Sequence, residues 1–246
     1  MSTGFSNIVY QWLNFAQFWL LPPTCVLCQR QGQTQLDLCR SCQATLPWLE
    51  HACPVCALPL PRSGLAKCGR CLQGQRRIHR TCSAFRYDSP VSELISQFKY
   101  QRMLAAGRVL TSLLAQQIQL HYQDLPLPEL LLPIPLHPSR LRQRGYNQAL
   151  LMTRELSLAL QIPLAATLLH RTRATPAQQG LKARERRRNL RGAFTVDPRW
   201  QQVQVQRVAL IDDVVTTMST VQEVARALER SCSRPLEIHV WCLARA

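Results

Sequence analysis

The chain has 246 residues, enough for one full-sized domain and a smaller module, and 46% of them are hydrophobic. Its 30 Lys and Arg residues against 14 Asp and Glu residues give a formal net charge of +16. Such an excess favours a polyanionic partner, either nucleic acid, a phosphorylated metabolite or an anionic lipid surface. Because no apolar run reaches the roughly 18 residues typical of a membrane span, we expect a folded, soluble protein.

The first 21 residues are rich in aromatic side chains, with Trp12, Phe15, Phe18 and Trp19 in a stretch without charge. We predict an aromatic helix over residues 1–21 that docks on the protein's own core. The alternative is an interfacial helix on the inner membrane surface, although the basic face typical of such helices is missing. The segment also lacks the basic start and the cleavage site of an export signal, so we expect a cytoplasmic location, with membrane association left as the alternative.

Eight of the 11 cysteines form four Cys-x-x-Cys pairs, separated by ten, ten and eleven residues. A two-residue spacer lets two thiolates point at one ion, and two such pairs complete the four-thiolate set that zinc favours. We therefore predict two structural zinc ions. The expected ligands are Cys25, Cys28, Cys39, Cys42, Cys53, Cys56, Cys68 and Cys71.

The cysteine-bearing segment is too short and too polar to fold on apolar burial alone, whereas a structural zinc supplies on the order of 10 kcal/mol of folding free energy. A closed site of four cysteines leaves no coordination position for a catalytic water. Spacing leaves the pairing open between consecutive pairs, as in tandem ribbons, and alternate pairs, as in a cross-brace. We favour consecutive pairs.

From about Ala84 the pattern changes to alternating helices and strands, which predicts an α/β domain with a parallel sheet. Residues 89–120 have the spacing of two helices. Further along, we expect a strand at "PELLLPIP", followed by a polar loop and by a helix at "NQALLMTRELSLAL". A second strand at "VQVQRVALI" is followed by another helix, and the last strand is expected at "PLEIHVWCLAR". In open parallel sheets, ligands bind beyond the carboxyl ends of the strands.

The segment "VALIDDVVTTMST", residues 208–220, places two carboxylates and four hydroxyl groups at such an end. Thr220 and Glu223 fit a capping box that would begin a helix, whose first amides attract a phosphate. Asp212 and Asp213 only accept hydrogen bonds, which suits sugar hydroxyls or a Mg²⁺ ion. The set is complementary to a ribose 5-phosphate, and the alternative is an ordinary polar turn before a capped helix.

The same segment is similar to the phosphoribosyl-diphosphate loop of type I phosphoribosyltransferases. Together with the cysteine pairs, "RLRQRGYNQA" and "RTRATPAQQGLKARERRRNLRGAF", it resembles the ComF family of competence and DNA-utilisation proteins over nearly the whole chain after residue 20. The resemblance implies a double zinc ribbon over residues 22–80. It also implies a type I phosphoribosyltransferase-like domain, a parallel sheet flanked by helices, over residues 81–246.

The resemblance further implies the roles of individual residues. Asp212 and Asp213 would be the catalytic pair that faces the ribose hydroxyls, and Mg²⁺ would accompany the phosphoribosyl diphosphate. The pyrophosphate would lie at the loop from His137 to Asn147, with Arg140 and Arg144. The 5-phosphate would be held by Thr216, Thr217, Met218, Ser219 and Thr220.

One residue departs from the family pattern, since Met218 stands where the family usually has Gly. A left-handed backbone costs a residue other than Gly roughly 1 to 2 kcal/mol. We therefore predict that Met218→Gly strengthens phosphate binding.

Residues 171–191 are dense in Arg, and four of these arginines share one face if the segment is helical. Several Arg side chains in a row can bind successive phosphates, so we expect a contact with nucleic acid or with the diphosphate. The alternative is a solvated charged face. The four residues are Arg184, Arg187, Arg188 and Arg191.

Two functions follow. The favoured one is a DNA-handling protein of the ComF type, which helps incoming single-stranded DNA towards recombination or use as a nutrient and retains a phosphoribosyl-diphosphate site. Single-stranded DNA, a ribose phosphate and DNA-processing proteins are the expected partners. The alternative is an active phosphoribosyltransferase with a nucleobase-like acceptor.

Overall fold

The computed structural model describes residues 22–61, 67–74, 77–174, 189–232 and 234–246. The chain divides into two compact units, Met1–Leu46 and Pro47–Ala246. The helix expected over residues 1–21 and most of the Arg-rich stretch lie outside the described residues.

The described part of the first unit has little regular structure. Two isolated bridges, Thr24 with Gln31 and Gln33 with Leu36, precede the short helix α2 (Arg40–Ala44). The sulfur of Cys39 accepts a hydrogen bond from the amide of Cys42 at 3.4 Å, so one cysteine pair caps this helix. A cysteine cluster, rather than a large apolar core, thus organises the described part of this unit.

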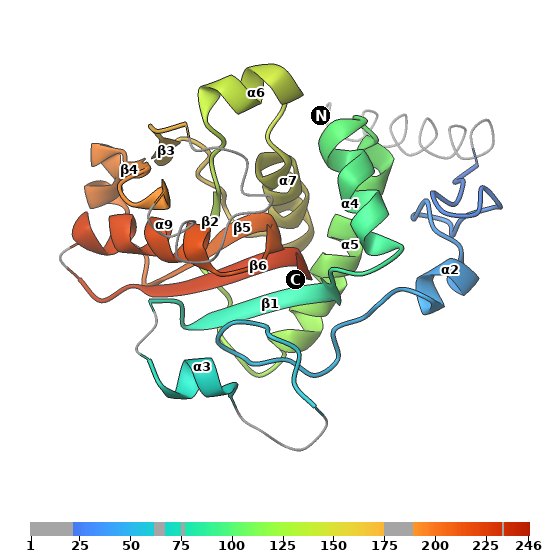
Figure 1. The fold of residues 1–246 in the computed structure, drawn as a ribbon, viewed down its shortest axis with the longest axis horizontal. Coiled ribbons are helices and arrows are strands. Elements are labelled where there is room, and N and C mark those ends of the chain that lie inside the picture. The colour runs from blue at the N-terminus through green and yellow to red at the C-terminus, as the bar shows by residue number, and fades with distance from the viewer. Residues whose placement is uncertain (1–21, 62–66, 75–76, 175–188, 233) are drawn as a thin grey trace, which may run out of the picture. The chain divides into compact units, whose positions relative to one another are not determined.

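A four-stranded parallel sheet forms the centre of the second unit, with strand order β1-β6-β5-β2 (Figure 1). The expected parallel α/β fold is therefore confirmed. The strands are β1 (Arg80–Arg86), β2 (Leu130–Pro133), β5 (Arg207–Val215) and β6 (Glu237–Arg245). All but the first residue of β6 are buried, as expected for a central strand with covered faces.

Helices cover both faces of this sheet, α9 on one and α5 with α7 on the other (Figure 1). The apolar spacing in residues 89–120 does produce two helices, α4 and α5. Val221, Val224, Ala225 and Leu228 form the buried face of α9, as their spacing predicts. The helix bounds are α3 (Gly69–Leu72), α4 (Val91–Tyr100), α5 (Leu104–His121), α7 (Gln148–Leu160) and α9 (Ser219–Arg230).

Several elements differ from the sequence-based expectation. The polar segment expected as a loop after β2 contains the helix α6 (Pro138–Arg144), because His137 caps its first turn and Gly145 ends it with φ 86°. β1 was not expected as a strand. β3 (Leu169–Arg171) and β4 (Phe194–Val196) pair antiparallel on either side of the Arg-rich stretch, followed by the 3-10 helix η1 (Pro198–Gln202).

The strand β5 is also longer at its carboxyl end than expected. Its pairing with β6 continues to Val215 opposite Arg245, so Asp212 and Asp213 lie within the strand rather than beyond it. Successive residues of a strand point to opposite faces. The two carboxylates consequently have different surroundings.

Candidate ribose-phosphate site

A cavity of about 950 Å³ opens at the carboxyl end of β5. Most of its lining comes from three parts of the second unit: the carboxyl-terminal half of α4, the helix α6, and the segment from Asp212 into α9. Tyr87 and Arg102 complete it. All five residues expected to hold the 5-phosphate line this cavity, as do Asp212, Arg140 and Arg144. The structure thus brings together, around one cavity, residues that the sequence predicts from two separate motifs.

The acidic pair is divided between two environments. Asp212 lines the cavity, and one of its oxygens accepts the amide of Asp213 at 2.9 Å. Asp213 is buried, and its carboxylate accepts a hydrogen bond from the ammonium group of Lys99 at 2.9 Å. Because Lys99 lies on α4, this ion pair ties the end of β5 to the opposite wall of the cavity.

The charges of these groups depend on one another. Burial and the neighbouring charge of Asp213 raise the pKa of Asp212 to about 7, although Lys99 opposes the shift. Burial lowers the pKa of Lys99, but Asp213 more than offsets it, so the pKa of Lys99 is raised overall and the ammonium is charged. The cavity therefore contains a carboxyl group that exchanges its proton near neutral pH.

The hydroxyl-rich turn leads directly into the helix α9. Thr217 and Ser219 share a hydrogen bond between their hydroxyl groups at 2.7 Å. Met218 is the N-cap with φ 65°, the left-handed conformation that usually requires Gly. The first amides of a helix have no partner within the helix, so this turn presents N–H donors and hydroxyl groups to the cavity.

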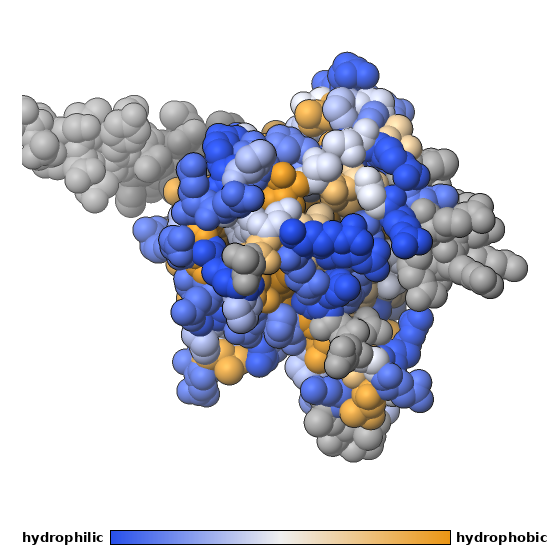
Figure 2. All heavy atoms as spheres, turned by 90° about the vertical axis from the view of Figure 1, so that its left-hand side faces the viewer, coloured by the Kyte–Doolittle hydropathy of each residue, from blue (hydrophilic) through white to orange (hydrophobic). Residues whose placement is uncertain are grey.

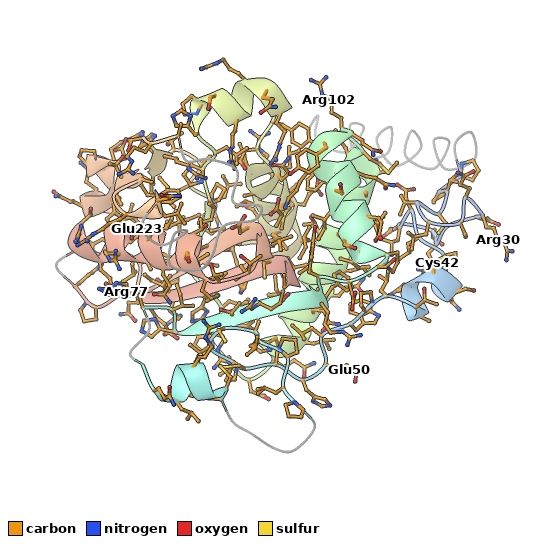
Figure 3. All side chains as sticks on the ribbon, viewed as in Figure 1. Arg30, Cys42, Glu50, Arg77, Arg102 and Glu223 are labelled. Atoms are coloured by element: carbon orange, nitrogen blue, oxygen red, sulfur yellow. The ribbon has the colours of Figure 1, made fainter. Side chains whose placement is uncertain are left out.

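The capping box expected from Thr220 and Glu223 is wrong, because the N-cap of α9 is Met218, two residues before Thr220, and Glu223 has other partners. Glu223, labelled in Figure 3, accepts the amide of Gly192 at 2.8 Å and a guanidinium hydrogen bond from Arg226 at 2.6 Å. It thereby connects α9 to the segment just after the Arg-rich stretch.

Two arginines of α6, Arg140 and Arg144, line the cavity. Arg144 donates to the side-chain oxygen of Gln148 at 2.8 Å, and its guanidinium lies 5.1 Å from the ring centre of Tyr100. Both Arg140 and Arg144 are half-buried. Fixed guanidinium groups of this kind suit a diphosphate, since Arg binds phosphate oxygens through two parallel hydrogen bonds.

The Arg-rich stretch is only partly described. Arg184, Arg187 and Arg188 lie outside the described residues. Arg191 is exposed and does not line the cavity, and its carbonyl accepts a hydrogen bond from Arg173 at 3.1 Å. The contact expected from these four residues stays a prediction.

Sequence reasoning missed the α4 side of the cavity, where Lys99 and Tyr100 contribute a cation and an aromatic ring and Arg102, labelled in Figure 3, adds a second charge. The signal available was "FKYQR", a cluster of charged and aromatic residues at the end of a predicted helix. The sequence alone could not show that this cluster lies beside Asp212 and Asp213, because the two segments meet only in the folded chain.

The eight paired cysteines form two clusters, Cys25, Cys28, Cys39 and Cys42 in the first unit and Cys53, Cys56, Cys68 and Cys71 in the second. Within each cluster the four sulfur atoms lie within 4.8 Å of one another. The sulfur atoms of Cys28 and Cys39 are 3.7 Å apart, and those of Cys56 and Cys68 are 3.6 Å apart. A tetrahedral zinc with Zn–S distances of ~2.3 Å requires about 3.8 Å between sulfurs. Both sets fit zinc, and the expected consecutive pairing is confirmed.

Comparison with known proteins supports this arrangement. Residues 16–72 match the family model described as a double zinc ribbon domain. Competence protein F of Haemophilus influenzae is 36% identical over 211 residues, which cover 85% of this chain and 90% of the relative. The chain belongs to the ComF family. The DNA utilization protein YhgH of Escherichia coli K12 is likewise 36% identical, over 92% of this chain and 98% of that protein.

Solved structures show a weaker likeness. An adenine phosphoribosyltransferase from Giardia lamblia, complexed with 9-deazaadenine, is 18% identical to this ComF protein. The match covers 63% of this chain and 71% of that one, with a TM-score of 0.36. In the described part of the chain, every helix is too short or too polar to cross a bilayer.

Proposed function

We propose that the protein handles DNA that the cell takes up, either for recombination or as a nutrient, and that its cavity binds phosphoribosyl diphosphate or a related ribose phosphate. The names of its ComF relatives, a competence protein and a DNA utilization protein, support the cellular role. The observation that carries the molecular part is the cavity where Asp212, the Thr216–Thr220 turn and the α6 arginines meet.

The chemistry of the cavity suggests how such a ligand is held. The amides and hydroxyls of Thr216–Thr220 suit the 5-phosphate, since the start of a helix attracts an anion. The ionised form of Asp212 suits the sugar hydroxyls, and Arg140 and Arg144 suit the diphosphate. A Mg²⁺ ion would enter with the diphosphate, whose charge it neutralises, with Asp212 as the protein ligand available in the cavity.

Single-stranded DNA is the proposed macromolecular partner. The formal net charge of +16 and the arginines of residues 171–191 would bind a polyanion in a manner that weakens with salt. Tyr100 is 64% exposed at the cavity, so the part of its ring that the Arg144 guanidinium leaves uncovered offers a surface on which a base can stack. DNA-processing proteins are expected as further partners of this role.

A second candidate function is phosphoribosyl transfer to a nucleobase-like acceptor, and the near-neutral pKa of Asp212 is the observation that favours it. In that reaction the base nitrogen bonds to the sugar carbon as the bond to diphosphate breaks. Asp212 would accept the proton of the nitrogen, and a group titrating near the working pH is efficient in this role. Arg140 and Arg144 would stabilise the departing diphosphate.

We place the protein in the cytoplasm, with residues 1–21 as a segment that contacts either the protein itself or the inner membrane surface. The aromatic side chains of Trp12, Phe15, Phe18 and Trp19 support the second contact. Fractionating the full chain beside a variant lacking residues 1–21 tests it, and equal recovery of both in the cytosolic fraction would exclude the membrane contact.

The test of the proposed function is calorimetric titration of the zinc-loaded full chain with phosphoribosyl diphosphate and Mg²⁺, with and without a short single-stranded DNA. We expect binding of both ligands, with Asp212→Asn weakening the first by at least about tenfold and leaving salt-sensitive DNA binding intact. Asp124→Asn is the matched control, since Asp124 is exposed and does not line the cavity.

The outcomes separate the candidates. Consumption of phosphoribosyl diphosphate with one added base would favour the transferase. Absence of binding heat with the wild-type protein would overturn the ribose-phosphate site, and DNA binding that does not respond to salt would overturn the proposed electrostatic contact.

A further inference from the structure

The guanidinium group of Arg245, at the end of β6, lies between two parts of the second unit. Its Nε donates to the carbonyl oxygen of Cys56 at 2.9 Å, and its Nη1 donates to the carbonyl oxygen of Val215 at 3.1 Å. The residue is only 4% exposed. A buried charge is costly unless hydrogen bonds replace its water. The carbonyls of Cys56 and Val215 supply two of these hydrogen bonds, and the carbonyl of Ala246 also accepts one from Nη1.

The two carbonyls belong to functionally different segments. Cys56 is one of the four cysteines of the second cluster. Val215 lines the cavity and immediately precedes the Thr216–Thr220 turn, and its carbonyl also accepts the amide of Ala246 at 3.0 Å. One side chain therefore connects the second metal cluster to the base of the candidate phosphate-binding turn.

A second set of contacts holds the same cysteine segment to the sheet. The amide of Thr81, in β1, donates to the carbonyl oxygen of Pro54 at 2.8 Å, and its hydroxyl donates to that of Val55 at 2.8 Å. The segment that carries Cys56 is thus fixed to β1 through Thr81 and to the end of β6 through Arg245. Its position relative to β5 is defined by these hydrogen bonds.

We propose that Arg245 is a positioning residue that couples the second zinc cluster to the phosphate-binding turn. Zinc holds the Cys53–Cys56 segment in its folded form, because a structural zinc site contributes folding free energy. The Cys56 carbonyl holds the guanidinium, and the guanidinium holds Val215 where the turn begins. Loss of zinc from this cluster loosens the turn, although no cysteine lines the cavity in the described residues.

The first cysteine cluster provides an internal control. It has the same four-cysteine arrangement but belongs to the other compact unit. Cys42 and Cys71 occupy the same place in the two clusters, the last of four ligands, and both are half-buried. Replacing either one removes a single ligand from a single cluster.

The test is amide hydrogen exchange of the full zinc-loaded chain, read at residues 216–220. We expect Cys71→Ser to speed exchange in this turn at least about tenfold and Cys42→Ser to change it less than about twofold. Equal effects of the two variants, or none from Cys71→Ser, would overturn the coupling. No ligand is needed, so failure here is distinct from failure of the proposed ribose-phosphate site.

Arg245→Gln keeps the test decisive if Cys71→Ser does not fold. This variant should retain both zinc ions, measured as metal per chain, while the turn exchanges at least about tenfold faster than in the wild-type protein. Wild-type exchange in this turn would overturn the coupling. Where Cys71→Ser folds, the double variant is the next comparison. Combining the two substitutions should add little, because both break the same connection. Additive effects would show that Arg245 merely stabilises the fold.

Coupling between two sites is reciprocal, which provides a second readout. Inorganic phosphate, as the probe for the turn, should slow zinc transfer from the second cluster to a chromogenic chelator and leave the first cluster unchanged. Arg245→Gln should abolish this protection. If phosphate binds the wild-type protein without slowing zinc transfer from the second cluster, the coupling is refuted.

Discussion

Asp212 and Asp213 are adjacent in the sequence, yet they do different things in the fold. A strand turns successive side chains to opposite faces, so only one carboxylate of the pair lines the cavity and the other binds Lys99. The sequence-based prediction identified the pair but gave both carboxylates the same role. It could not reveal Lys99 as the partner, because that contact joins residues far apart in the chain.

The raised pKa of Asp212 predicts that binding depends on pH. The ionised carboxylate is the stronger acceptor for sugar hydroxyls and is the form that binds Mg²⁺, so affinity for ribose 5-phosphate with Mg²⁺ should rise with pH up to about 7 and then level off. The change approaches about tenfold per pH unit below the pKa. Affinities measured by calorimetry from about pH 5.5 to about pH 8.5 check this.

The ligand's phosphate titrates in the same range, so Asp212→Asn serves as the control on the same ligand. The difference between the affinity–pH profiles of the wild-type protein and of Asp212→Asn measures the contribution of the Asp212 carboxyl group. Parallel profiles would mean that this carboxyl does not contact the ligand. The free energy of unfolding should change with pH in the opposite direction to the affinity. A carboxyl whose pKa is raised in the folded state makes folding less favourable as pH rises from about 4 to about 7.

Met218 shows a conflict between binding and packing. Its φ of 65° costs roughly 1 to 2 kcal/mol, whereas its side chain is 3% exposed and belongs to the hydrophobic core. We expect Met218→Gly to strengthen phosphate binding, since a turn without Cβ can approach the anion more closely. The same change should lower the free energy of unfolding by about 1 to 3 kcal/mol, because lost burial outweighs relieved strain.

Calorimetry with inorganic phosphate and denaturant unfolding measure the two effects separately. Met218→Leu, which keeps an apolar side chain and the strain, should not strengthen binding. A gain in affinity for both variants would point to changed packing rather than to backbone freedom.

At the level of elements, periodic apolar spacing predicted the four longest described helices, α4, α5, α7 and α9, but not the short helices, of which α6 lines the cavity. That helix has seven residues with no buried side chain, so it lacks an apolar stripe; Pro138 in its first turn, the His137 cap and the left-handed Gly145 define it instead. The strand β1 was missed because it is buried by pairing with β6, a partner at the other end of the chain.

The orientation of α6 predicts different roles for its arginines. Arg140 lines the cavity, whereas Arg142, on the same helix, is exposed and does not. Arg140→Gln should weaken phosphoribosyl diphosphate binding about tenfold and ribose 5-phosphate binding much less, since only the first ligand carries a diphosphate. Arg142→Gln is the matched control. Equal losses for both ligands would assign Arg140 to the 5-phosphate or to the fold.

At the level of the whole molecule, the zinc clusters were the most predictable feature, because the Cys-x-x-Cys spacing identifies all eight ligands. The spacing left the pairing open, and the structure shows that consecutive pairs share a cluster. The boundary between the two compact units could not be predicted from the cysteine spacing. The two clusters look alike in sequence, but the boundary falls between them, at Leu46 and Pro47, and the second cluster belongs to the unit with the sheet. That placement comes from contacts with β1 and Arg245.

The net charge of +16 is also a property of the whole chain. Hydrophilic side chains cover most of the described part of the face shown in Figure 2. An excess of positive charge favours a polyanionic partner. Charge alone does not identify the polyanion, so the DNA partner depends on the family relationship. The ribose-phosphate site depends on the residues of one cavity.

The most direct measurement is a crystal structure of the zinc-loaded protein grown with ribose 5-phosphate and Mg²⁺. We expect the phosphate within hydrogen-bonding distance of the backbone amides at residues 216–220, and a sugar hydroxyl within that distance of Asp212. A sugar phosphate bound away from this turn, with the turn packed against its neighbours, would contradict the account.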